Sequence, residues 1–156
     1  MPNSESPGAP PVPELLKEFP VVVSLPVQWG DQDSFGHVNN TVYFRWCETA
    51  RVAYFERIGM SMFVAQDGKG PILAAIRCDF RRPVTYPDTV HIGARVTRVG
   101  NSSFQMEHKI VSRAEGIVVA ESDSTLVLRD YLAERSTPLP ASIRKAISEL
   151  EGRLVK

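Results

Sequence analysis

The chain has 156 residues, a length typical of one domain and sufficient to bury a hydrophobic core without disulfides or metals. Hydrophobic residues make up 43% and charged residues 23%, as in ordinary soluble globular proteins. Because 18 Lys and Arg balance 18 Asp and Glu, the composition argues against a nucleic-acid or membrane-surface partner, which would call for excess positive charge.

The first 18 residues are expected to be disordered or loosely packed, and residues 19–156 to form a single domain. Five of the twelve prolines fall in residues 1–14, with Ser, Gly and Glu between them. The N-terminus has neither the basic start nor the apolar run of a signal peptide, and no apolar stretch is long enough to span a membrane. The two cysteines, Cys47 and Cys78, lie in apolar stretches. Their count alone permits a disulfide, but without a secretion signal we expect buried, reduced thiols and a cytoplasmic protein.

The first strand is predicted from Val21 to Trp29, where apolar residues recur with a period of two. Pro26 removes a donor from the ladder, which places this strand at a sheet edge or at a bulge. A turn-rich stretch follows over residues 30–40.

A long helix is predicted over residues 41–58. It is apolar on nearly all sides, so we expect other structure to wrap around it. Asn39 or Asn40 can cap its start, and Gly59 lies where a helix often needs a left-handed residue to end.

Four more strands are predicted over residues 72–81, 90–97, 104–110 and 117–131. Short gaps join the last three, which indicates an antiparallel meander. A final helix is expected from about Pro140. The resulting class is α+β, with one antiparallel sheet packed on one helix. One helix leaves sheet edges open, so we expect a second copy of the chain to cover them.

The chemically informative segment is WGDQDSFGHVNNTVY, residues 29–43. Asp31, Asp33 and His37 lie directly before the long helix, whose free N–H groups can stabilise negative charge on a carbonyl oxygen. A nearby carboxylate can attack that carbonyl or activate water. The same residues also suit turn, cap and structural roles. The three side chains can also act as metal ligands, but the spacing does not call for a metal and we predict none.

This run, followed by Glu48-x-Ala50-Arg51, resembles the signature of the 4-hydroxybenzoyl-CoA thioesterase-like branch of the hotdog superfamily. The resemblance covers about residues 19–132. It implies a hotdog fold, in which an antiparallel sheet wraps around one long central helix. It also implies hydrolysis of an acyl-CoA thioester without a cofactor, by a homodimer or homotetramer with its sites between subunits. The acyl group stays open.

The resemblance assigns roles to residues of the loop. Asp33 matches the catalytic carboxylate, as nucleophile or general base, and the backbone N–H near Asn40 matches the group that polarises the thioester oxygen. Gly36 would let the backbone pass close to the substrate. His37 matches a His of plant acyl-ACP thioesterases. Their Asn two residues earlier is replaced here by Phe35, which favours Asp33 as the central group.

The resemblance identifies the residues that contact the substrate less specifically than it identifies the catalytic residues. Glu48 either faces the acyl group, as in the hydroxybenzoyl enzymes, or pairs with Arg45 or Arg51. The candidates for the CoA phosphates, which can equally be solvated strand-end charges, are Arg81, Arg82 and Arg98. The candidates for the acyl pocket, which can equally be core, are Phe35, Tyr43, Trp46, Cys47 and Met60.

Three other functions fit the same fold. An acyl-ACP thioesterase would keep the mechanism and change the carrier. The hotdog hydratases resemble one another in pairing an Asp and a His five residues apart, or a His with a helix Glu. His37 here is four residues from Asp33 and six from Asp31, a spacing that argues against a hydratase. A non-catalytic acyl-CoA-binding module would not need Asp33. His108, on an apolar strand face, is expected to be a hydrogen-bonded core residue.

Overall fold

The computed structural model describes residues 12–60 and 67–156. In this part of the chain the strands are β1 (Val21–Pro26), β2 (Lys69–Phe80), β3 (Thr89–Val99), β4 (Ser103–Ser112), β5 (Ile117–Asp130) and β6 (Arg135–Ser136). The helices are α1 (Val12–Leu15), the 3-10 turn η1 (Trp29–Asp31), α2 (Asn40–Arg57) and α3 (Ala141–Glu151).

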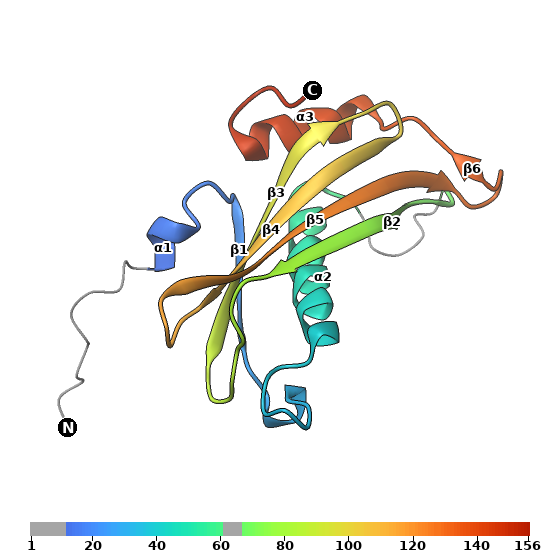
Figure 1. The fold of residues 1–156 in the computed structure, drawn as a ribbon. Coiled ribbons are helices and arrows are strands. Elements are labelled where there is room, and N and C mark those ends of the chain that lie inside the picture. The colour runs from blue at the N-terminus through green and yellow to red at the C-terminus, as the bar shows by residue number, and fades with distance from the viewer. Residues whose placement is uncertain (1–11, 61–66) are drawn as a thin grey trace.

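The strands form one antiparallel sheet in the order β1-β3-β4-β5-β2, with the short β6 paired to β5 (Figure 1). The predicted meander of the last three long strands is confirmed, as is the edge position of β1 that Pro26 indicates. β2 lies beside β5 at the far edge, with Phe80 opposite Ala120. This pairing joins segments distant in sequence, and no local pattern predicts it.

Helix α2 lies against one face of the sheet, the inner face (Figure 1). Alternate residues of the central strands, such as Ile92, Met106 and Leu126, turn toward it and are fully buried. The predicted α+β hotdog fold, a sheet around one central helix, is therefore confirmed. None of the helices in the described part of the chain has both the length and the apolar character needed to cross a membrane.

The opposite, outer face carries the N-terminal segment. Within residues 12–18, where the composition predicts loose packing, α1 forms and Leu16 packs with Phe19 and Val111. Gly93 makes this approach possible, because a Cβ there would lie 2.6 Å from the Phe19 ring. Residues 1–11 of the same segment lie outside the described residues.

Helix α3 begins after Pro140, as expected, and buries Ile147. Its last residue, Glu151, accepts hydrogen bonds from the Tyr54 hydroxyl (2.6 Å) and the Val96 N–H (2.7 Å). One carboxylate thereby connects α3 to both α2 and β3.

Candidate functional site

The loop between η1 and α2 closes into a tight turn around Asp33. The Asp33 N–H donates to the His37 carbonyl (2.9 Å), and the Gly36 N–H donates to the Asp33 carbonyl (3.0 Å). Gly36 has a φ of +78°, a conformation that glycine adopts without strain. The Phe35 N–H donates to Asp33 Oδ1 (2.9 Å). Because no described residue donates to Oδ2, the carboxylate is held in place with one oxygen still available.

Asp31 has a different environment from Asp33. Its Oδ2 accepts from the Gln28 N–H (2.8 Å), and its carbonyl accepts from the Asn39 N–H (2.9 Å). The first bond caps η1, and the second ties the end of the loop to it. Each of the two carboxylates thus accepts one backbone N–H, and they differ in place: Asp33 lines the pocket at the start of α2 described below, and Asp31 does not.

The start of α2 is capped by Asn39, one of the two predicted caps. Asn39 Oδ1 accepts from the Thr41 N–H (3.0 Å) and from the Thr41 hydroxyl (2.7 Å). Asn40 is the first helical residue, and its N–H donates to no acceptor in the described residues. A free N–H at a helix start carries partial positive charge, as the polarisation of a carbonyl requires.

A pocket of about 430 Å³ opens between this loop and the end of β2. Six of the nine predicted site residues line it: Asp33, His37, Asn40, Tyr43, Arg81 and Arg82. The other lining residues are Phe35, Val38, Phe80 and Pro83. The Val38 N–H bonds to the Val84 carbonyl (2.8 Å) and helps to hold residues 33–43 beside residues 80–83.

The apolar wall of the pocket is aromatic. The rings of Tyr43 and Phe80 pack edge to face, with centroids 5.0 Å apart. Burial raises the pKa of Tyr43, so its phenol stays neutral. Sequence reasoning missed Phe80, although its place directly before Arg81 and Arg82, both candidates for the CoA phosphates, was a usable signal. Of the five acyl-pocket candidates, Phe35 and Tyr43 line the pocket, while Trp46, Cys47 and Met60 are core.

Two arginines at the pocket rim differ in their partners. Arg81 donates to Glu121 (3.0 Å), in an ion pair that is about half exposed. Arg82 is exposed and takes part in no ion pair between described residues. Arg82 therefore has the guanidinium that is free to meet an anionic group.

Three predicted site residues do not line the pocket. Gly36 shapes the turn beside it. Glu48 is exposed on α2 and, within residues 12–60 and 67–156, pairs with neither Arg45 nor Arg51. Arg98 is exposed near the end of β3, away from the loop.

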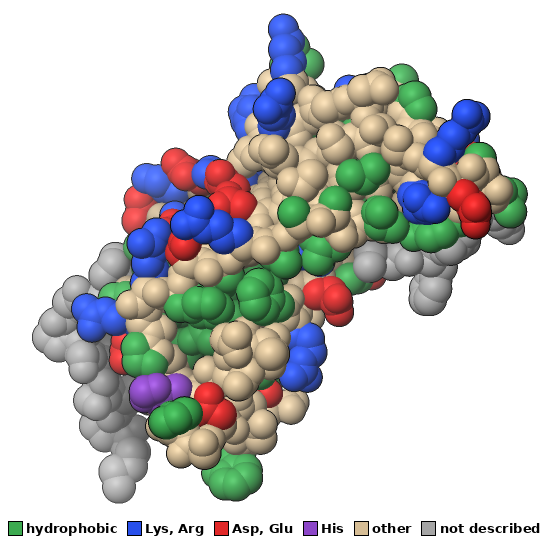
Figure 2. All heavy atoms as spheres, turned by 45° about the vertical axis from the view of Figure 1, so that its right-hand side comes forward, with side chains coloured by type: hydrophobic (Ala, Val, Ile, Leu, Met, Phe, Trp, Pro, Cys, Tyr) green, Lys and Arg blue, Asp and Glu red, His purple; other side chains and the backbone are tan. Residues whose placement is uncertain are grey.

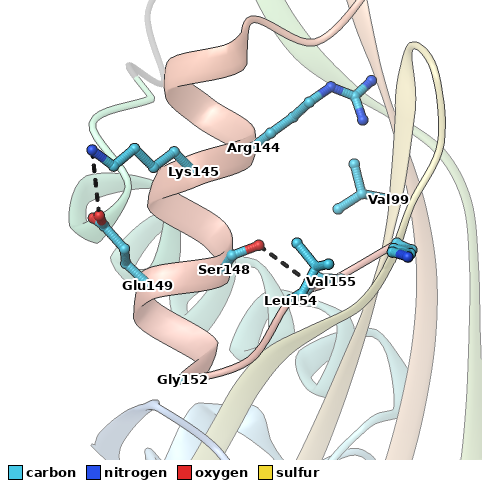
Figure 3. Close-up of a pocket in the computed structure, with 9 residues that line it drawn as sticks. Val99, Arg144, Lys145, Ser148, Glu149, Gly152, Leu154 and Val155 are labelled. Atoms are coloured by element: carbon cyan, nitrogen blue, oxygen red, sulfur yellow. Dashed lines mark hydrogen bonds and ion pairs between the residues drawn. The ribbon is translucent and has the colours of Figure 1, made fainter.

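A larger groove, of about 840 Å³, lies between α3 and the end of β3 (Figure 3). Its polar groups already have partners: Lys145 pairs with Glu149 (3.7 Å), and Ser148 Oγ accepts from the Val155 N–H (3.2 Å). In Figure 1, α3 and the start of α2 lie at opposite ends of the molecule. Despite its size, this groove therefore lacks the acid and helix start that the smaller pocket combines.

The prediction that His108 is hydrogen-bonded is wrong. The side chain is 1% exposed, and neither ring nitrogen has a hydrogen-bond partner among residues 12–60 and 67–156. Burial, followed by the nearby charge of Arg51, lowers the pKa of His108 to about 3. Its neighbours across the ladders are Ala94, which is apolar, and Ser122, whose hydroxyl does not reach it.

The fold and site together define a hotdog protein with a carboxylate and a helix start at its pocket. The model of the thioesterase-like superfamily matches residues 27–147, and the chain therefore belongs to this superfamily. No group of three or more His, Cys, Asp or Glu that could hold a metal is found in the residues that the structure describes.

Solved structures of similar proteins support this membership. The PA2801 protein from Pseudomonas aeruginosa is 38% identical, over 83% of this chain and 98% of that one, with a TM-score of 0.74. A thioesterase from Thermus thermophilus, complexed with coenzyme A and Zn, is 36% identical, over 88% of this chain and 98% of that one, with a TM-score of 0.78.

Some curated relatives are longer than this chain. Protein THEM6 from Danio rerio is 29% identical over 110 residues, which are 70% of this chain and 54% of that protein. The chain thus spans about half the length of this relative.

Proposed function

We propose that the chain hydrolyses acyl-CoA thioesters to a free acid and CoA, with Asp33 as the carboxylate that drives the reaction. One observation carries the proposal: Asp33, with one oxygen unbound, lines the same pocket as Asn40 at the start of α2. The similar thioesterase from T. thermophilus binds coenzyme A, which supports CoA as the carrier.

The chemistry follows from these two groups. The thioester oxygen would lie at the Asn40 N–H, where the helix dipole stabilises the charge that develops as the carbonyl is attacked. Asp33 either attacks the carbonyl carbon, expelling CoA thiolate and leaving an anhydride that water opens, or takes a proton from the attacking water. In both routes the sulfur leaves as CoA thiol and the acyl group as an acid.

The aromatic wall and the rim arginines would contact different parts of the substrate. Tyr43 and Phe80 would contact the apolar part of the substrate next to the thioester. Arg82, assisted by Arg81, would meet the CoA phosphates, since guanidinium groups bind phosphate through paired donors. We assign no such contact to Arg98, which lies away from this rim.

We further propose that the active form is a homodimer in which a second copy covers the edge of β2. This strand ends the sheet, and Leu73 and Phe80 on it are 44% and 48% exposed. Figure 2 shows hydrophobic side chains exposed in several areas of one face of the molecule. Because Phe80 also lines the pocket, a partner at this edge would close the site as well as the sheet.

Thiol release from benzoyl-, short-, medium- and long-chain acyl-CoAs tests the proposal. Asp33→Asn should lower kcat/KM about a hundredfold or more, because the amide is neither base nor nucleophile. Asp31→Asn is the matched control: an Asn oxygen can still accept from the Gln28 N–H, so most activity should remain.

Two outcomes would contradict this function. Turnover of Asp33→Asn at the wild-type rate would remove Asp33 from the chemistry. An absence of thiol release from every acyl-CoA by folded wild-type protein would exclude CoA thioesters as substrates. Acyl carrier protein thioesters and acyl-CoA binding would then be measured.

A further inference from the structure

A cluster of buried polar side chains lies beneath α2, away from the thioester pocket. Its members, the buried polar cluster, are Arg51, His108, Ser122 and Ser124, each at most 4% exposed. Within the described residues, six of their atoms have no partner that meets the geometry of a hydrogen bond: Arg51 Nε and Nη2, both His108 ring nitrogens, and the two serine hydroxyls, of which that of Ser122 lies near the Cys47 thiol. Buried polar groups nearly always form hydrogen bonds, so six buried polar atoms without partners in one cluster need an explanation.

The members are neighbours in space. His108 on β4 lies opposite Ser122 on β5, and Ser124 is two residues further along the same buried face. Arg51, on α2, lies close enough to His108 for its charge to contribute to the lowered pKa of the imidazole. The orphaned atoms therefore converge from the helix and from two strands.

The cluster contains one positive charge and no counter-charge. Burial raises the pKa of the adjacent Cys47 thiol to about 12, so it is no thiolate, and His108 and the serines are neutral. Arg51 forms no ion pair with any described residue. Burial lowers the pKa of Arg51 more than the charge of exposed Glu48, one turn away, raises it. A buried, uncompensated guanidinium is strongly unfavourable, so a compensating group is required.

The chemistry of that group can be read from the orphaned atoms. Nε and Nη2 lie on one edge of the guanidinium and form its side-on fork; Arg95 uses the same two atoms to bind Glu107 (2.9 and 2.6 Å). Together with the serine hydroxyls and one imidazole N–H, these atoms are mostly hydrogen-bond donors, so the ligand must be an acceptor. Because Arg51 is the single cation of the cluster, the ligand should carry one negative charge. Because the cluster is buried, the ligand must be small.

We propose that the buried polar cluster binds a small monovalent anion of the halide class. The anion would accept hydrogen bonds from the Arg51 fork and from the serine and imidazole donors. It would thereby hold α2 to β4 and β5. Arg51 is eleven residues beyond Asn40 along α2, about 16 Å at the helical rise, so this site is separate from the thioester pocket.

Thermal unfolding of the full chain in chloride or bromide, against gluconate at equal ionic strength, tests the proposal. At about ten times the dissociation constant, halide should raise the melting temperature by roughly 3–6 °C, and above that concentration the rise should continue with the logarithm of the halide concentration. Arg51→Met should abolish this halide-specific rise. Arg45→Met, which removes an exposed arginine from the same helix, should retain it. No halide-specific rise in wild type, or an equal rise in Arg51→Met, would overturn the proposal.

Crystals of the wild-type protein grown in bromide test whether the anion occupies the buried polar cluster, even if Arg51→Met does not fold. The expected result is an anomalous peak among Arg51, His108, Ser122 and Ser124. Bromide peaks at the surface alone, with water or nothing in the cluster, would overturn the proposal. As a milder variant, Ser124→Ala should raise severalfold the halide dissociation constant obtained from the concentration dependence of the melting temperature, and an unchanged value would exclude Ser124 from the site.

Discussion

At the level of single residues, the two acids of the loop show how position relative to the pocket separates chemical roles. Asp31 and Asp33 are two residues apart, and each carboxylate accepts one backbone N–H, but only Asp33 lines the pocket at the start of α2. Spacing alone places both next to the helix. The position of each side chain relative to the pocket distinguishes the acid that caps η1 from the candidate catalyst.

His37 supplies the first residue-level prediction. Its side chain lines the pocket, but its contact with Asp33 is through the backbone carbonyl, which alanine retains. We expect His37→Ala to lower kcat/KM by less than about tenfold, well below the loss in Asp33→Asn. Steady-state kinetics on the best acyl-CoA would measure both. A larger loss in His37→Ala would move the chemistry toward the arrangement of the plant acyl-ACP enzymes.

Glu151 supplies the second residue-level prediction. Glu151→Ala removes the acceptor of both the Tyr54 hydroxyl and the Val96 N–H, and should lower the free energy of unfolding by about 2–3 kcal/mol. Glu149→Ala, on the same helix, breaks only an exposed pair with Lys145 and should cost no more than about 0.5 kcal/mol. Urea unfolding of the two variants gives the comparison. Equal losses would show that the buried carboxylate contributes nothing beyond a surface one.

His108 predicts a pH dependence. Burial lowers its folded-state pKa to about 3 from an ordinary 6.5, so between these values the unfolded chain binds more protons. Stability should therefore fall as the pH drops through 6.5, by about 2 kcal/mol between pH 7 and 5. His108→Gln should lack this contribution, so its urea midpoint in halide-free buffer should fall less over that range. Parallel curves for wild type and variant would contradict the assignment.

At the level of elements, the start of α2 both stabilises the helix and positions the Asn40 N–H. Asn39→Ala removes the cap and should cost about 1 kcal/mol in unfolding free energy, whereas Asn39→Ser, which also caps, should lose little. Chemical denaturation of both variants tests this difference. If the alanine and serine variants were equally stable, the cap would have no energetic role.

Local patterns predicted the elements well where they are regular. α2 runs from Asn40 to Arg57, one residue earlier at each end than the predicted helix. The three strands of the meander agree to within a few residues, because each alternates cleanly between the inner and outer faces. The two-residue β6 was missed, since two residues carry no period.

At the level of the whole molecule, the two sheet edges give a matched test of the proposed dimer. Leu73 on β2 and Val22 on β1 are 44% and 45% exposed, at opposite edges. Leu73→Lys should raise the dimer dissociation constant at least about tenfold, because a charge would be buried at the interface, while Val22→Lys should leave it unchanged. Analytical ultracentrifugation measures both. Weaker association only in Val22→Lys would place the interface at β1.

The sequence by itself determined the α+β class, the central helix, the meander and the loop with its two acids. These features follow from periodicity and from residue types within a few positions of each other. Only the tertiary structure placed β2 beside β5, brought Phe80 and Arg82 to the loop of Asp33, and left Arg51 and His108 without partners. Each of these depends on strand register and on packing between distant segments, which no local pattern of residues encodes.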